Sequence, residues 1–554
     1  MPNRLILGPI PDDFNPSSDR LVWPGSIVGK ESSLHYPNAL PIRHDNKIKN
    51  ISDVTAIRNT INTVFLKKFS NYLNTYHKQN YSIQFWTILL DYHLFMEVYI
   101  LWQHYQNLTY AIDQLGKNHY DCIVLKKFPF ESPPIDPFHL RYRVHQTIQF
   151  HHWILSSILC QLNPINVNCI DGLEQTLQHN KNEAYSSLKN KDFPRCGFIS
   201  GMSNQKMRLL SLYLSIKKPS TQTHKIKLSP LDASELLPKE FIDIATTILM
   251  QTLPLCYTKN FDHFNNYALK KNYKPGKYRL YGPVLHGHEY LKFCMAHAYE
   301  KGERIIGYQH GSGYGLSKTH HHHCWVEYID TFVSWGWTDN FSKILALPSP
   351  LLSSFNKKYK KNSESLILIN TGGLPPVLHS SLTMRHHNVI FLNALNPSIR
   401  AQTFYRPYNR DPLMLDDSSY ISNYCPTVKF IENQHHNQDD LHKKLFACKL
   451  TVLGNPGTSF LIALMANIPT VCYFHPDHWA FTPHSQITID KLKLAKVIFD
   501  TPEAAAQHVN QYWHDIDTWW QSHTVQEARL FFNQNYALTK KNWFFQWFKA
   551  LRKL

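Results

Sequence analysis

The residues best suited to chemistry gather around a glycine-rich segment in the middle of the chain, residues 307–315 (GYQHGSGYG). Gln309 and His310 stand near its start, and the carboxylates Glu327 and Asp330 follow it. A histidine with a carboxylate within reach is the minimum for general-base chemistry on a hydroxyl group. The pattern therefore predicts a catalytic set of His310, Glu327, Gln309 and Asp330, in which Asp330 orients the others.

The glycines of this segment predict a loop at the end of a strand. Each glycine weakens a helix or a central strand by about 0.5 to 1 kcal/mol, and three of them stand in five positions here. Residues 304–308 read as a short buried strand, and ligands of an open parallel sheet lie beyond the carboxyl ends of its strands. The amides of Gly311 and Gly313 are therefore predicted to approach a bound donor. The structural alternative is that the two polar residues before the glycines only hydrogen-bond the backbone of the loop.

A second glycine-rich turn follows a predicted strand nearer the C-terminus. Residues 449–453 read as the strand, residues 454–459 (GNPGTS) as the turn, residues 460–466 as a helix and residues 470–474 as a further strand. Strand, turn, helix and strand in this order form a βαβ unit of a parallel sheet.

This turn predicts an anion site at a helix N-terminus, where the first amides lack partners and the macrodipole is positive. Gly457, Thr458 and Ser459 would hold the anion without the lysine of a Walker loop. Arg406 offers a planar fork for a phosphate, and His475 follows the next strand on the same edge of the sheet. For each of these side chains a structural role, as a helix cap, a salt-bridge partner or a packed histidine, stays open.

A run of four histidines, residues 320–323, raises the question of a metal site. Adjacent residues cannot all face one ion, and apart from Cys324 no cysteine or carboxylate stands at ligand spacing beside them. No aspartate pair of the DxD type follows a predicted strand either. The sequence therefore predicts no metal and no cofactor, and a solvated loop for the histidine run.

The composition is that of a large, basic, globular protein. The chain has 554 residues, of which 43% are hydrophobic, and a formal net charge of +17. The basic residues are scattered without a nucleic-acid-binding motif, so the charge favours anionic substrates or an anionic membrane surface over nucleic acid. The ten cysteines form no CxxC pair, which indicates reduced thiols and a cytosolic compartment. Polar residues interrupt the most apolar stretch, residues 87–101, so no transmembrane helix is predicted.

Hydrophobic spacing gives the order of the elements. The first third is predicted to be mostly helical, over residues 53–107 with a second helix at residues 83–105. Further helices are predicted at residues 238–253 and 288–301, and short strands at residues 120–125, 197–200, 365–370 and 388–392.

Four regions follow from this order. Residues 1–345 form the first domain, residues 346–363 a polar, proline-bearing linker, residues 364–520 a Rossmann-like nucleotide-sugar domain and residues 521–554 a C-terminal helix. The last stretch, KKNWFFQWFKALRKL, is aromatic and basic. It is predicted either to lie on an anionic membrane or to pack its aromatic face back on the first domain.

The joint pattern resembles a family of bacterial transferases found in surface-polysaccharide and nonulosonic-acid gene clusters. Its pattern is a QHGG-type loop with a following Tyr-Gly, a downstream Glu and Asp, and a WGW, matched here by Gln309, His310, Gly311, Tyr314, Gly315, Glu327, Asp330, Trp335, Gly336 and Trp337. The similarity covers most of the chain and includes Leu73, Asn74, His77, Phe85, Trp86, Arg406, Gly457, Thr458, Ser459 and residues 467–470. Two positions depart from it: Ser312 replaces the second loop glycine, and Ile462 stands where a glutamate that touches the donor ribose is common.

The resemblance implies an α/β fold of the GT-B type, with two Rossmann-like domains facing a cleft and a helical N-terminal region. It implies a metal-independent glycosyltransferase that binds a nucleotide-sugar donor on the C-terminal domain and a glycan or lipid-linked acceptor on the N-terminal domain. By similarity to transferases of acidic sugars, we expect a CMP-activated acidic sugar as donor and a surface glycan such as lipopolysaccharide O-antigen or capsule as target. We expect the protein in the cytoplasm. The basic aromatic tail adds the alternative of a peripheral location at the inner face of the cytoplasmic membrane.

Two alternatives stay open. A nucleotide-sugar epimerase of the same fold would act on its sugar without an acceptor. A non-catalytic scaffold would use the basic aromatic tail to organise glycan assembly at the membrane.

Overall fold

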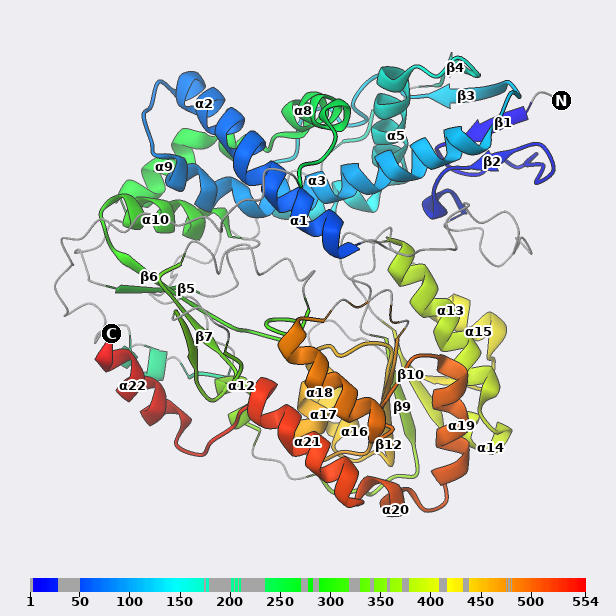
Figure 1. Cartoon of the computed structure of the whole chain (residues 1–554), viewed down its shortest axis with the longest axis vertical. Coiled ribbons are helices and arrows are strands. Elements are labelled where there is room, and N and C mark those ends of the chain that lie inside the picture. Colours follow the sequence, from blue (N-terminus) through cyan, green and yellow to red (C-terminus); the bar gives the residue numbers. More distant parts are fainter. Residues whose placement is uncertain are drawn as a thin grey trace.

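The computed structural model describes residues 3–27, 50–173, 176–178, 201–203, 205–207, 209–210, 235–270, 278–281, 288–317, 329–338, 343–355, 359–370, 378–407, 416–431, 438–474, 476, 479 and 481–554. Across these ranges helices surround three parallel β-sheets, so the fold class is α/β, as expected. Figure 1 shows the sheet β1–β4 and the N-terminal helices in the upper part of the view, with the other two sheets below them. Within the described ranges, no helix combines the length and the apolar character needed to cross a membrane.

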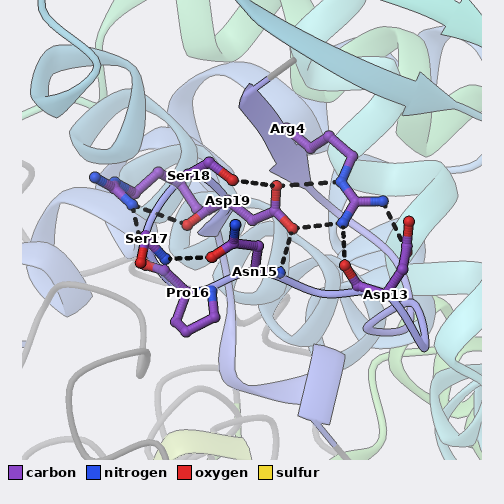
Figure 2. A network of polar contacts seen from close by, with 8 residues as sticks. Arg4, Asp13, Asn15, Pro16, Ser17, Ser18 and Asp19 are labelled. Atoms are coloured by element: carbon purple, nitrogen blue, oxygen red, sulfur yellow. Dashed lines mark hydrogen bonds and ion pairs between the residues drawn. The ribbon is translucent and has the colours of Figure 1, made fainter. Parts of the chain in front are cut away.

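The first sheet joins the N-terminus to strands far along the chain. Four parallel strands lie in the order β2-β1-β3-β4: β1 (Asn3–Ile6), β2 (Arg20–Leu21), β3 (Tyr120–Val124) and β4 (Val167–Asp171). Figure 2 shows how Arg4 closes the loop between β1 and β2, by pairing with Asp19 at 2.6 Å and with Asp13 at 2.8 Å. Because the Asp19 carboxylate is buried and paired, it fixes this loop on the sheet.

Helices form most of the first third, as predicted. They are α1 (Asn50–Thr60), a π-helical turn (Ile61–Phe65), α2 (Leu66–His77), α3 (Ile83–Gln114), α4 (Pro137–Tyr142), α5 (Ile148–Leu162), α8 (Lys239–Thr252), α9 (Phe261–Lys270) and α10 (Glu289–Glu300). The long α3 contains the most apolar stretch of the chain, and two of its buried carboxylates are paired inside the protein. Arg58 pairs with Asp91 at 2.8 Å, and His145 lies 2.8 Å from Glu97. The helix is therefore a core element of the first domain.

The middle sheet carries the first glycine-rich loop. Four parallel strands lie in the order β5-β6-β7-β8: β5 (Tyr278–Tyr281), β6 (Arg304–Tyr308), β7 (Thr331–Ser334) and β8 (Ile344–Ala346). Side chains alternate between the two faces of a strand, and Ile305 and Phe332 join the main core. On the other face, Ile306, Tyr308 and Val333 form a second core with the end of the chain.

The end of the chain crosses back to this sheet, as the red helices in Figure 1 show. After α21 (His523–Tyr536) comes α22 (Trp543–Lys553), whose Trp543, Trp547 and Leu551 belong to the second core. The indole of Trp547 donates to the carbonyl of Pro348 at 2.8 Å. One of the two interpretations of the tail expected this packing; the other, membrane contact, concerns the opposite face of α22.

The last domain is built on a doubly wound parallel sheet. Six strands lie in the order β11-β10-β9-β12-β13-β14: β9 (Leu366–Ile369), β10 (Thr403–Arg406), β11 (Lys429–Phe430), β12 (Leu450–Leu453), β13 (Thr470–Tyr473) and β14 (Ile498–Phe499). The first strand lies in the middle and the chain winds outward to one side and then to the other, as in dinucleotide-binding folds. The strand order reverses between β9 and β12, and ligands of such sheets bind beyond the carboxyl ends of the strands at that point.

One predicted strand of this domain is wrong. Residues 388–392 (NVIFL) lie inside helix α13 (Leu378–Ala394). A short apolar run fits a buried helix as well as a strand, and Val389, Phe391 and Leu392 are all buried in the core.

The other predicted elements lie close to their expected places where they are described. Predicted and observed ends differ by two residues at most, with two exceptions: the first helix begins three residues earlier than predicted, at Asn50, and the helix from residue 83 extends to Gln114. The predicted strand at residues 197–200 lies outside the described residues, and the predicted linker contains the short helix α12 (Pro350–Ser353). The remaining helices are α14 (Pro397–Arg400), α15 (Asp417–Tyr424), α16 (Gln438–Leu445), α17 (Thr458–Met465), α18 (Pro483–Leu494), α19 (Pro502–Tyr512) and α20 (Ile516–Trp520).

Candidate active site

The first glycine-rich loop leaves the carboxyl end of β6, as predicted. Gln309 continues the sheet, since its N–H donates to the carbonyl of Val333 at 2.9 Å. Gly313 and Gly315 have φ angles of 92° and 69°, a region that favours glycine. A Cβ at Gly315 would also lie 2.4 Å from the ring of Trp337. Glycine is thus required for the loop to fold tightly against this ring.

Gln309 is buried and holds the loop from inside. Its Nε2 donates to the carbonyl of Gly311 at 2.8 Å. Its Oε1 accepts from the N–H of Trp335 at 2.8 Å and from the Nε1–H of Trp337 at 2.9 Å. These are bonds of the kind that the structural alternative predicted, so the side chain of Gln309 positions the loop and the WGW turn.

His310 is the histidine of this loop. Its Nδ1 lies 2.9 Å from the hydroxyl of Tyr314, a buried residue whose ring stacks on Phe332 with centroids 5.5 Å apart. Burial lowers the pKa of His310 to about 4, because a charged imidazolium would lose its hydration there. The imidazole is therefore neutral at physiological pH and can accept a proton.

One predicted carboxylate lies far from His310. Asp330 precedes β7 and so stands at the amino end of the parallel strands, whereas His310 follows β6 at their carboxyl end. Its Oδ2 accepts a hydrogen bond from the N–H of Ile305 at 2.7 Å. The prediction that Asp330 orients His310 is wrong, because this carboxylate holds the start of β6. Glu327 lies outside the described residues.

The second glycine-rich turn follows β12, where the strand order of the last sheet reverses. Gly457 is the N-cap of α17, and no side chain caps this helix. Thr458 and Ser459 lie inside its first turn, so the capping role considered for them is not formed. A helix N-terminus without a side-chain cap offers its first amides to an anion at this edge of the sheet.

The two glycine-rich segments touch each other across the domains. Thr458 Oγ1 accepts a hydrogen bond from the N–H of Ser312 at 3.2 Å. Gly311 faces the same oxygen, and a Cβ at Gly311 would lie 2.9 Å from it. His310 is the neighbour of Gly311 in the chain, so the backbone that carries the predicted base lies next to the predicted anion turn.

Two residues that the sequence analysis missed hold the far end of this loop. Thr482 donates through Oγ1 to the carbonyl of Gly315 at 3.0 Å, and its N–H donates to the carbonyl of Leu316 at 3.0 Å. Ser485 Oγ donates to the same Leu316 carbonyl at 2.7 Å. The sequence signal was a threonine before a proline with a serine three residues on, which is typical of the start of a helix, here α18.

Arg406 is the last residue of β10 and is half-buried at the carboxyl edge of the same sheet. One strand, β9, separates β10 from β12, which puts Arg406 about 10 Å across the sheet from the anion turn. The geometry allows both to contact one ligand with two or more charged groups. His475 lies outside the described residues.

A buried polar network lies at this edge of the sheet and was also missed. Asp417 is an ion-pair partner of Arg385, with Arg385 Nε 3.0 Å from Asp417 Oδ1, and both side chains are buried. Asp417 also accepts hydrogen bonds from Tyr405 OH, at 3.1 Å, and from the amide of Asn370, which follows β9. Asp416 is the N-cap of α15, and Asp417 is the first residue of that helix and is buried.

No group of histidine, cysteine, aspartate and glutamate side chains within the described ranges could hold a metal ion. The histidine run at residues 320–323 lies outside these ranges.

The sequence of the chain matches a family model over residues 4–551, and the description of that family is LIC12162 family transferase. Among curated proteins, no sequence matches the chain.

Solved structures share parts of the architecture at low sequence identity. MurG of Acinetobacter baumannii is 11% identical, with 79% of this chain and 100% of that chain covered and a TM-score of 0.34. TarM is 11% identical, with 52% of this chain and 57% of that chain covered and a TM-score of 0.33. UDP-GlcNAc 2-epimerase from Methanocaldococcus jannaschii is 9% identical, with 78% of this chain and 99% of that chain covered and a TM-score of 0.32. At these TM-scores the likenesses assign no activity.

Proposed function

Because the chain belongs to the LIC12162 family of transferases, we propose that it is a glycosyltransferase. The observation that supports this most is the contact between Ser312 and Thr458, which brings a neutral histidine beside a helix N-terminus suited to phosphate. Sugar transfer from a nucleotide needs both parts: a base for the acceptor hydroxyl and an anion site for the leaving phosphate.

The donor would bind on the last domain. Its phosphates would lie against the amides of Thr458 and Ser459, next to Gly457, whose own N–H donates to the carbonyl of Asn455 at 2.9 Å. Arg406 and His475 are proposed as further contacts of the phosphates. The formal charge of +17 favours a donor with several negative groups. From the family resemblance, the first candidate is a CMP-activated acidic sugar.

In the reaction, the acceptor oxygen attacks the anomeric carbon of the sugar. The bond between that carbon and the phosphate oxygen breaks, and the nucleotide leaves with the bonding electrons. His310 takes the hydroxyl proton, while its Nδ1 contact with Tyr314 keeps the ring in place. The amides of the anion turn stabilise the charge that develops on the leaving phosphate.

The wider setting also comes from the resemblance. We propose that the acceptor is a glycan or lipid-linked intermediate of a surface polysaccharide, such as lipopolysaccharide O-antigen or capsule. The enzyme would work in the cytoplasm at the inner face of the membrane, without a metal and without nucleic acid. Gly311 and Gly313 would shape the acceptor side of the loop and reach the donor from the first domain.

Thermal shift of the purified protein tests the donor, since a ligand that binds only the native state raises the melting temperature. The panel is CMP, CDP, UDP, GDP and their sugars. We expect a selective response to CMP compounds, reduced in Thr458→Val. Thr247→Val, on the exposed side of α8, is the matched control because its hydroxyl bonds only the carbonyl of Asp243 in its own helix. A response to UDP or GDP compounds would change the assignment of the donor nucleotide, and no response to any nucleotide would contradict the proposal.

Product analysis separates transfer from epimerisation. A transferase forms a new glycoside only when acceptor is present, whereas an epimerase converts or hydrolyses its nucleotide sugar alone. Conversion of the sugar at the same rate with and without membrane-derived acceptor would favour the epimerase.

A further inference from the structure

Helix α22 has two faces of different chemistry. The buried face docks on the middle sheet through residues at every fourth position: Trp543, Trp547 and Leu551. The opposite face has exposed residues at the same spacing, Phe545, Lys549 and Lys553, and the exposed Lys541 precedes the helix. Because residues four apart share one side of a helix, the second set forms a stripe that faces away from the protein.

This exposed stripe is basic, with one large apolar ring in it. Phe545 is 63% exposed, and Arg552 beside the stripe is exposed as well. No acidic side chain follows Glu527 in the sequence, so the exposed stripe contains lysines and no aspartate or glutamate. The partner that complements such a face is anionic and accepts an apolar side chain.

The dimensions of α22 restrict how it could meet a lipid. Its 11 residues span about 16 Å, whereas the hydrocarbon core of a bilayer is about 30 Å thick. The apolar face is already occupied by the second core. The helix can therefore lie along a surface but cannot insert across it.

We propose that the exposed stripe of α22 docks the protein on a bilayer that contains anionic phospholipid. The lysines and Arg552 would lie among the lipid head groups, and Phe545 would enter the interface beside them. The exposed phenyl ring favours lipid over duplex nucleic acid, because the phosphate backbone that covers a duplex offers nothing apolar at its surface.

This docking would act on the site through the other face of the helix. The ring centroids of Trp547 and Tyr308 lie 6.5 Å apart. Tyr308 is the last residue of β6, and Gln309 and His310 follow it directly in the chain. The helix would thus set the distance and orientation of the histidine loop to the membrane. If the proposed function holds, a lipid-linked acceptor would reach His310 along that surface.

Vesicle sedimentation of the full-length protein tests the proposal. The probes are vesicles of phosphatidylcholine alone and of phosphatidylcholine with phosphatidylglycerol. We expect binding to the anionic vesicles only, weaker at high salt because surface charges are screened. Lys549→Glu with Lys553→Glu should lower the partition coefficient at least about tenfold, and Phe545→Ala should lower it further when combined with them.

The matched control is Lys67→Glu with Lys68→Glu, which makes the same charge change at exposed positions on α2, away from α22 in Figure 1. If the α2 variant binds anionic vesicles as well as the unmodified protein does, the proposal is supported. If the α2 and α22 variants lose vesicle binding equally, the effect comes from net charge alone and the proposal is overturned. Equal binding to both vesicle types, or preferential capture by duplex DNA in direct competition, would also overturn it. None of these results depends on donor binding, so the glycosyltransferase proposal stands or falls separately in the thermal shift.

Discussion

Replacement of Gln309 by alanine is the sharpest test of how the candidate active site is held. The substitution removes three hydrogen bonds and leaves the carbonyl of Gly311, the N–H of Trp335 and the Nε1–H of Trp337 without this partner. A buried polar group that loses its partner costs about 1 to 3 kcal/mol, so three groups amount to roughly 3 to 9 kcal/mol. Water that enters the vacated space recovers part of this, so we expect a loss of about 3 to 5 kcal/mol.

Urea denaturation followed by tryptophan fluorescence measures this loss, because Trp335 and Trp337 lie at the site itself. Gln521→Ala is the control: it removes the same side chain at an exposed position after α20, and we expect a change within about 0.5 kcal/mol. A second readout is nucleotide affinity, which should fall in Gln309→Ala because the loop that meets Thr458 is no longer fixed. Wild-type stability and wild-type nucleotide affinity together would refute the positioning role of Gln309.

Three further predictions follow from particular contacts. Gly311→Ala places a Cβ 2.9 Å from Thr458 Oγ1, so we expect calorimetry to show weaker nucleotide binding with an unchanged far-ultraviolet spectrum; unchanged affinity would contradict the contact between the loops. Asp417→Ala removes the carboxylate that pairs with the buried Arg385 and should lower the free energy of unfolding by about 3 to 5 kcal/mol, whereas a variant as stable as wild type would show that this ion pair adds nothing to stability. Burial lowers the pKa of His310 to about 4, as it does for His93 and His297. Since unfolding returns such a histidine to a pKa near 6.5, the unfolded state binds more protons, and stability should be full above pH 6.5 and fall as the pH drops toward 4. A melting temperature that stays level or rises over that fall in pH would contradict this.

Much of the fold could be predicted because the buried strands of the last domain are short apolar runs bounded by glycine, proline or polar residues. β9, β12 and β13 are buried at every residue, as parallel strands covered on both faces must be. The same signal failed at residues 388–392, since an apolar run of that length also fits one side of a helix such as α13.

The candidate site could be predicted only where the type and spacing of neighbouring residues in the sequence indicate a local structure. Glycine spacing located both loops, and their positions after β6 and β12 follow from it. Asp330 was placed wrongly because sequence proximity to His310 does not say at which end of a strand a residue lies. The contact between Ser312 and Thr458 joins two domains, and nothing in the local sequence of either segment marks its partner.

The most direct test of the central claim is nucleotide release from the sugar nucleotide that the thermal shift selects, measured with membrane-derived acceptor for the wild-type protein and for His310→Ala. The proposed role of His310 as base predicts that His310→Ala still binds the nucleotide but releases it at least about 100-fold more slowly. Release at the wild-type rate would remove His310 from the chemistry, and no release by the wild-type protein from any sugar nucleotide of the panel would contradict the glycosyltransferase assignment itself.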